Sequence, residues 1–310
     1  MNAAAATQPA PPKGRRRGFF TALEAYFYTA PAVILIVLVM LVPLAVGVSY
    51  AFRNIELLNP FSGGFVGLEN FRELAGDANF TRALVNTVWW TFGSVFIQFM
   101  MGLGLALLLR DAFPGRKIVQ ALVFLPWAVP TFLSGLNWAW LFNPVVGPLP
   151  HWMAAIGLLD TPRNILADPD LAMWGPITAN VWYGVPFFAI TLLAALQSIP
   201  DELYEAAAID GAGAWRRFTD LTLPFLAPTI AITVMLRTIW IANFADLIVV
   251  MTGGGPADTT QIVASYIFTQ AYRRLDFGYA SAIALVLLVL LLLYALAIIT
   301  LRRMMMREPS

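Results

Sequence analysis

The sequence predicts an all-α membrane protein with six transmembrane helices. Of its 310 residues, 59% are hydrophobic and only 12% are charged, and the mean hydropathy is +0.73. Soluble domains carry about 25% charged residues, and a core of this size cannot hide so much apolar surface from water. The composition therefore argues against a soluble enzyme and a disordered chain, and the absence of cysteine argues against a disulfide scaffold.

Six apolar stretches are long enough to cross a hydrocarbon layer of about 30 Å, which takes about 20 helical residues. They cover residues 27–52, 84–109, 119–142, 171–196, 223–251 and 279–301. Pro126 and Pro130 interrupt the third stretch, and Gly184 and Pro186 interrupt the fourth. Membrane helices tolerate such residues where neighbouring helices satisfy the freed backbone groups, and we expect a helix break at Gly184 and Pro186.

The positions of lysine and arginine predict the orientation. With six spans both termini lie on one side, and that side collects twelve of the nineteen basic residues, against six on the other side and Arg237 within a span. Because cytoplasmic loops are enriched in Lys and Arg, both termini are predicted to be cytoplasmic. We divide the chain into a basic tail with an interfacial segment (1–26), a six-span domain (27–301) and a C-terminal tail (302–310). The net charge of +1 gives no indication of a nucleic-acid partner.

The cytoplasmic segment 198–224 predicts a short helix-turn-helix. Pro200 is suited to start a helix, and the acidic residues that follow complement the positive end of the helix dipole. Three alanines favour the helix, and Gly211 and Gly213 end it before a second short helix over 214–219. Its alanine face would let another protein approach closely. The alternative is a passive amphipathic surface loop.

The same segment carries a motif. Glu205-Ala206-Ala207, with Gly211 after three further residues and Leu223-Pro224 beyond, resembles the EAA loop of binding-protein-dependent ABC importer permeases. The longer string from Gln197 to Pro224 is similar to the carbohydrate branch of these permeases. Thr252-Gly-Gly-Gly-Pro256 with Thr259-Thr260 resembles a signature of the first of their two permease subunits, the lactose, glycerol-phosphate and maltose type. The resemblance covers nearly the whole chain from the first span onward.

This resemblance implies the type I ABC importer permease fold in a bacterial inner membrane. It further implies four kinds of partner: a second permease subunit in a heterodimer, two ATPase subunits, an extracytoplasmic substrate-binding protein and a sugar-type substrate. The EAA helix would act as a coupling helix that docks on an ATPase, with Glu205 making the polar contact. The residues assigned to this coupling are Glu205, Ala206, Ala207, Asp210, Gly211, Arg216 and Arg217.

Nucleotide chemistry is expected on a partner chain. The sequence lacks the Gly-x4-Gly-Lys-[Ser/Thr] phosphate loop, and Gly253-Gly254-Gly255 is followed by Pro256 rather than by a lysine. We therefore expect ATP and Mg²⁺ on the partner ATPase, no cofactor or metal on this chain, and no catalytic residue. The chain also lacks the extra N-terminal spans and the large outer loop of the maltose-type subunit, which leaves the sugar open.

Polar residues within the spans predict a substrate path, because a charge at the centre of a membrane helix costs about 2.5–3.5 kcal/mol on insertion scales. Arg237, Trp240 and Phe244 share one helix face, and Arg237 and Asp246 lie about 13 Å apart along an unbroken helix, too far to neutralise each other. Aromatic rings beside amides or charges suit a sugar, which has an apolar face and a rim of hydroxyls. The candidates are Arg237, Trp240, Asn243, Phe244, Asp246, Asn180, Trp182, Tyr183 and Asn137.

Purely structural explanations remain open for some of the aromatic and acidic residues in or near the spans. Trp138 and Trp140 are equally explained as anchors at the membrane interface, and Asp246 could simply face water. An ion-gradient-driven secondary transporter is the alternative function, although it predicts buried carboxylates, and the spans contain almost none besides Asp246. An intramembrane serine hydrolase would need a histidine within the spans, and the single histidine, His151, lies in an outer loop.

Overall fold

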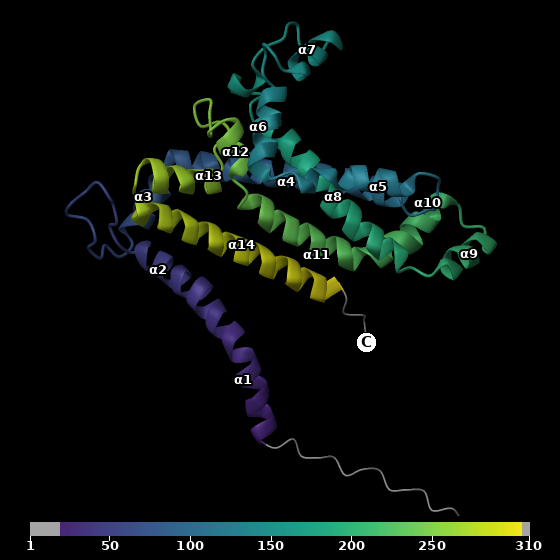
Figure 1. Ribbon diagram of the computed structural model, residues 1–310, viewed down its shortest axis with the longest axis horizontal. Coiled ribbons are helices and arrows are strands. Elements are labelled where there is room, and N and C mark those ends of the chain that lie inside the picture. The colour runs from purple at the N-terminus through teal and green to yellow at the C-terminus, as the bar shows by residue number, and fades with distance from the viewer. Residues whose placement is uncertain (1–18, 306–310) are drawn as a thin grey trace, which may run out of the picture. The chain divides into compact units, whose positions relative to one another are not determined.

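The computed structural model describes residues 19–305, with side chains apart from those of residues 19–25, 302, 303 and 305. The predicted basic tail before residue 19 and the last five residues lie outside this range. The described chain is helical, and its strand-like pairing is limited to isolated bridges between Arg53 and Phe65 and between Glu56 and Asp276. It divides into two units, residues 1–49 and 50–310. Both are drawn in Figure 1.

The α-helices differ widely in length, from four to 31 residues. In chain order they are α1 (Phe19–Ile36), α2 (Val42–Tyr50), α3 (Glu69–Gly76), α4 (Ala78–Leu108), α5 (Arg116–Phe124), α6 (Thr131–Leu141), α7 (Pro148–Ala155), α8 (Trp174–Gln197), α9 (Asp201–Ile209), α10 (Ala214–Arg217), α11 (Leu223–Ala242), α12 (Asp246–Met251), α13 (Val263–Phe268) and α14 (Phe277–Met305).

The first predicted span is one continuous helical stretch. Helix α1 passes through a π-helical turn, Val37–Leu41, into α2, and the apolar part covers Tyr26–Tyr50. Its length matches that of a bilayer core, as the sequence predicts.

The core of the second unit lies where α4, α8 and α11 pack together. Helices α4 and α8 run side by side (Figure 1), and Trp90 of α4 is fully buried. Its indole Nε1 donates a hydrogen bond of 2.9 Å to the main-chain oxygen of Ile241 in α11. A buried indole N–H is costly unless it has a hydrogen-bond acceptor, so this contact holds α4 against α11.

The third predicted span is not a single helix. Helix α5 and the 3₁₀ turn Leu125–Ala128 end before Pro130, and α6 then leaves at an angle of 98°. Val129 has an extended backbone (φ −92°, ψ 125°), as expected of a residue that precedes proline. By length and composition the described chain holds five spanning helices, or six if this bent pair counts as one.

Two further breaks differ from expectation. Helix α8 runs without interruption past Gly184 and Pro186, so the predicted break there is wrong; close packing against neighbouring helices supports the backbone that proline weakens. The fifth span, by contrast, pauses between Ala242 and Asp246. Asn243 donates its side-chain Nδ2 to the main-chain oxygen of Ile239 at 2.9 Å, and such a bond competes with the helical ladder.

The two ends of the second unit differ in character. Helices α9 and α10 lie at one end of the long helices, and α3 and α13 lie at the other (Figure 1). At the α3 end, Oδ2 of Asp77 accepts hydrogen bonds of 2.6 Å from the hydroxyls of both Tyr266 and Tyr279. Asp77 also caps α4, because its Oδ1 accepts from the N–H of Asn79. One carboxylate thus joins α4, α13 and α14.

Candidate functional site

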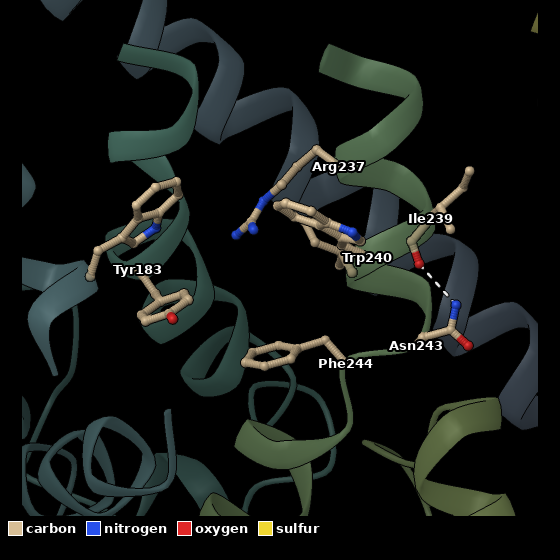
Figure 2. Close-up of a pocket in the computed structure, with 8 residues that line it drawn as sticks. Tyr183, Arg237, Ile239, Trp240, Asn243 and Phe244 are labelled. Carbon is tan, nitrogen blue, oxygen red and sulfur yellow. Dashed lines mark hydrogen bonds between the residues drawn. The ribbon is translucent and has the colours of Figure 1, made fainter. Parts of the chain in front are cut away.

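A pocket of about 390 Å³ lies between α8, α11 and the 3₁₀ turn that precedes α6. Figure 2 shows five predicted residues around it: Tyr183, Arg237, Trp240, Asn243 and Phe244. The remaining lining residues are Trp127, Ile239 and Ile241. Residues of two spans and of the bent third span therefore meet here, and the volume is in the range of small-molecule sites.

Arg237 is the charged residue of this pocket, and it is held by an amide. Its side chain is buried, and its Nε donates a hydrogen bond of 2.8 Å to Oε1 of Gln98 in α4. Gln98 is itself fully buried and donates its Nε2 to the main-chain oxygen of Asn180 at 2.8 Å. A Cβ atom on Gly184 would collide with both Gln98 and Arg237, so glycine in α8 makes room for the pair.

Aromatic rings form the walls. Tyr183 and Phe244 stack with centroids 6.1 Å apart and planes at 14°, and Trp240 packs on Phe187 at 5.5 Å. Phe187 in turn contacts Trp127 at 6.2 Å. The spacing of Arg237, Trp240 and Phe244 predicted a shared face, and all three do face the pocket, although Phe244 lies just beyond the end of α11.

Sequence reasoning missed Gln98 and Trp127. A signal existed for both: Gln98 is an amide in the middle of an apolar span, and Trp127 lies between the two prolines that break the third span. What the sequence does not contain is the direction in which either side chain points, because that depends on the packing of α4 and on the 98° bend.

The other four candidates lie outside the pocket lining. Asp246 begins α12, where its Oδ2 accepts a hydrogen bond of 2.9 Å from Oγ1 of Thr131, so the distance expected for an unbroken helix does not apply to it. Asn180 is fully buried, and its side-chain amide has no hydrogen-bond partner among the described residues. Trp182 packs on Trp138 at 6.0 Å, and Asn137 is exposed on α6.

The predicted helix-turn-helix forms a second site. Helix α9 begins directly after Pro200, as the sequence predicts, and the chain reverses at Gly211, whose φ of +76° lies in the left-handed region that favours glycine. The second helix does not stop at 219. It continues from α10 through the π-helical turn Phe218–Thr222 into α11, so the second helix of the helix-turn-helix and the fifth span form one continuous helix.

Contacts with two other elements hold α9 in place. Arg110, just after α4, forms an ion pair of 3.1 Å with Asp201, and its guanidinium carbon lies 3.7 Å from the centre of the Tyr204 ring. The Tyr204 hydroxyl lies 2.9 Å from Oγ1 of Thr222 at the base of α11. These contacts join α9 to the end of α4 and to the base of α11.

The outward face of this helix-turn-helix is exposed. Of the predicted coupling residues, Glu205, Ala206, Asp210, Gly211 and Arg216 are exposed, and Ala207 and Arg217 are half-buried. Ala207, Asp210, Arg216 and Arg217 also line a groove of about 360 Å³. Two large apolar side chains beside them, Ile209 and Trp215, are 87% and 76% exposed. Sequence reasoning missed this apolar pair.

A bundle of long apolar helices, a pocket between the spans and an exposed helical element continuous with one span define a polytopic membrane transport subunit. The chain belongs to the family of binding-protein-dependent transport system inner membrane components, and the match covers residues 98–305. It is accordingly a permease subunit of an ABC importer, as the motif predicted. The alternative of an ion-gradient-driven transporter finds no support in these comparisons.

Three similar proteins illustrate the relationship. The trehalose/maltose transport system permease protein MalF of Thermococcus litoralis is 39% identical over 221 residues, which are 71% of this chain and 74% of the relative. The sulfoquinovosyl glycerol transport system permease protein SmoG of Agrobacterium fabrum is 36% identical over 267 residues, which are 86% of this chain and 85% of the relative. A bacterial ABC transporter involved in the import of the acidic polysaccharide alginate has a chain that aligns with a TM-score of 0.80 and 25% identity, covering 92% of this chain and 96% of that one.

Proposed function

We propose that this permease forms half of the pathway by which an ATP-driven importer carries a sugar or sugar derivative across a bacterial inner membrane. The observation that carries the substrate assignment is the pocket of Figure 2, where aromatic rings surround a guanidinium and an amide. Tyr183, Trp240 and Phe244 offer flat apolar faces to the C–H face of a pyranose, while Arg237 and Asn243 offer polar groups to its hydroxyls.

The names of the relatives support the same class of substrate. The two curated relatives carry trehalose/maltose and sulfoquinovosyl glycerol in their names, and the structural neighbour is named for alginate. All of these compounds are carbohydrates or carry a sugar ring. The chain spans most of each of these proteins, so the comparison includes the pocket residues from Tyr183 to Phe244 as part of a shared fold.

The exposed helix-turn-helix is proposed as the coupling surface. In this arrangement ATP and Mg²⁺ bind to two partner ATPase subunits, one of which receives α9 and α10. Ile209 and Trp215 serve as apolar anchors and Glu205 as the polar contact, which is the usual division of roles in a protein interface. Because α10 continues into α11, which carries Arg237, an ATPase that moves the helix-turn-helix also moves the pocket.

The remaining partners in this proposal are those that the resemblance to importer permeases implies. A second permease subunit completes the pathway, and an extracytoplasmic binding protein delivers the sugar at the α3 end. Both termini are then cytoplasmic, in agreement with the excess of Lys and Arg in the tails and loops that the sequence assigns to the cytoplasmic side.

Reconstitution tests this proposal. The chain is co-expressed with a second permease, an ATPase and a binding protein from the same organism, purified and placed in proteoliposomes. We expect the ATPase to co-purify and the loaded binding protein to stimulate ATP hydrolysis and uptake of labelled sugar. Uptake that needs no ATP and follows an imposed proton or sodium gradient would refute the proposal.

A further inference from the structure

We propose that the substrate of this permease is an anionic carbohydrate whose carboxylate, sulfonate or phosphate group binds the guanidinium of Arg237. This inference rests on the proposed function of the pocket and narrows its substrate from sugars in general to sugars that carry a negative charge.

The first support is electrostatic. Arg237 is only 5% exposed, yet it has no acidic partner among the described residues. The ion pairs among the described residues are Arg110–Asp201, Arg163–Asp168 and Arg216–Asp220. No Asp or Glu lines the pocket. Arg237 is instead held by the neutral Gln98, which leaves the pocket with a net positive charge. Buried charges in membrane spans are normally paired or face a functional cavity.

The second support is the direction of the side chain. Gln98 binds only the Nε atom, and neither Nη group donates a hydrogen bond to any described residue. Figure 2 shows the guanidinium extending from α11 into the space between Tyr183 and Trp240. Two parallel N–H groups on one edge are the arrangement that binds carboxylate, sulfonate or phosphate oxygens in pairs.

The third support is preorganisation. Gln98 is fixed at its other end by the main-chain oxygen of Asn180, and Gly184 leaves just enough room for Gln98 and Arg237 against α8. The Arg237 guanidinium carbon also lies 5.9 Å from the centre of the Phe187 ring. The guanidinium is therefore held in one orientation before a ligand arrives, so little conformational entropy is lost on binding.

A structural arginine would be explained differently. A carboxylate of the second permease subunit could enter the pocket and neutralise Arg237, in which case the pocket would favour neutral sugars. The two arrangements differ in whether removal of the Arg237 charge changes the choice of ligand or the assembly of the permease pair, and the experiment below measures both.

The test compares matched sugars on the assembled transporter in lipid nanodiscs without binding protein, so that only the membrane site selects. The probes are methyl β-glucuronide against methyl β-glucoside and glucose 6-phosphate against glucose, with affinities measured by calorimetry. We expect the wild type to favour the anionic member of at least one pair on the order of tenfold or more, because hydrogen bonds to charged groups are strong. Higher salt should weaken that preference.

Three variants connect the preference to Arg237. Arg237→Gln should remove it, and Arg237→Lys should keep part of it, because lysine retains the charge but not the paired N–H edge. Arg273→Gln, which removes one exposed arginine outside the pocket, is the matched control and should behave like the wild type. Co-purification of the second permease subunit is measured for each variant.

The outcomes separate this inference from the proposed function. Equal affinity for both members of both pairs in the wild type, or a preference that survives in Arg237→Gln, overturns the anionic substrate and leaves sugar import standing. Preference for the neutral members, together with loss of the second subunit from Arg237→Gln, assigns Arg237 to a subunit contact and also overturns the inference. Failure of the wild type to bind any of the four sugars overturns the inference, and failure of the assembled transporter to import sugar refutes both proposals.

Discussion

The hydroxyl of Tyr204 in α9 lies 2.9 Å from Oγ1 of Thr222 at the base of α11, and this contact joins the exposed helix to the span that carries Arg237. Tyr204→Phe should therefore weaken transmission while leaving the fold intact, since one such hydrogen bond contributes about 0.5–1.5 kcal/mol. We expect fewer sugar molecules imported per ATP hydrolysed in proteoliposomes. Tyr272→Phe removes an exposed hydroxyl elsewhere and should not change this ratio.

Glu205 is exposed on α9, and reversal of its charge should block the contact with the ATPase. We expect Glu205→Lys to abolish ATP-driven uptake while the chain remains in the membrane at wild-type abundance. Uptake assays and membrane immunoblots measure the two quantities. Asp111→Lys makes the same charge reversal at an exposed site outside the helix-turn-helix and away from the α3 end, and it should leave ATP-driven uptake unchanged. Normal uptake by Glu205→Lys would remove Glu205 from the coupling surface.

Gly184 faces Gln98 and Arg237 so closely that a methyl group has no space. Gly184→Ala should displace the pair, with an overpacking cost of about 1–3 kcal/mol, and should lower sugar affinity together with thermal stability. Gly104→Ala is the matched control in a membrane helix, because nothing lies within 4 Å of the added Cβ. Calorimetry and thermal unfolding in nanodiscs report the two effects, and wild-type affinity in Gly184→Ala would contradict the described packing.

Asp77 makes stability depend on pH at the α3 end. Burial raises the pKa of its carboxyl, but hydrogen bonds from Tyr266, Tyr279 and two backbone N–H groups outweigh burial and hold that pKa below its ordinary value of 3.8. A lowered pKa means that Asp77 stabilises the fold at neutral pH and that this contribution is lost as the pH falls below about 3.8. Asp77→Asn should therefore lower the melting temperature at pH 7 and flatten its decline in acid.

Glu73 provides the contrasting case for the same measurement. Burial and the nearby charges of Asp276, Asp77 and Glu69 raise the pKa of its carboxyl above the usual 4.5. A raised carboxyl pKa destabilises the fold at neutral pH, so Glu73→Gln should raise the melting temperature at pH 7. If Asp77→Asn and Glu73→Gln shift the melting temperature in the same direction, the described electrostatics of this end are wrong.

Local signals made the helix-turn-helix and the spans predictable. Pro200 and Gly211 mark the ends of α9 through their own backbone preferences, and hydropathy depends only on a window of neighbouring residues. The 98° bend of the third span also has a local cause, because Pro126 and Pro130 interrupt the helix there. The two prolines do not, however, predict the direction in which α6 leaves. The interruption after Ala242 coincides with the hydrogen bond from the Asn243 side chain to the main-chain oxygen of Ile239, and hydropathy does not register such a bond.

The pocket around Arg237 could be predicted only in part. Arg237, Trp240 and Phe244 share one face by spacing along a single helix, so their proximity needs no knowledge of packing. The pair of Arg237 with Gln98 joins residues 139 positions apart in the chain, and only the assembled bundle brings them together. The same holds for Trp127, which reaches the pocket through the bend in its span.

ATP-driven accumulation of sugar is the measurement that tests the central claim most directly. Proteoliposomes that contain this permease and its partner subunits, with ATP inside and the loaded binding protein outside, are assayed for labelled sugar over time. The account predicts accumulation against the gradient that stops when ATP is replaced by a non-hydrolysable analogue and is absent in Glu205→Lys. Accumulation that continues without ATP and collapses on addition of an ionophore would contradict it.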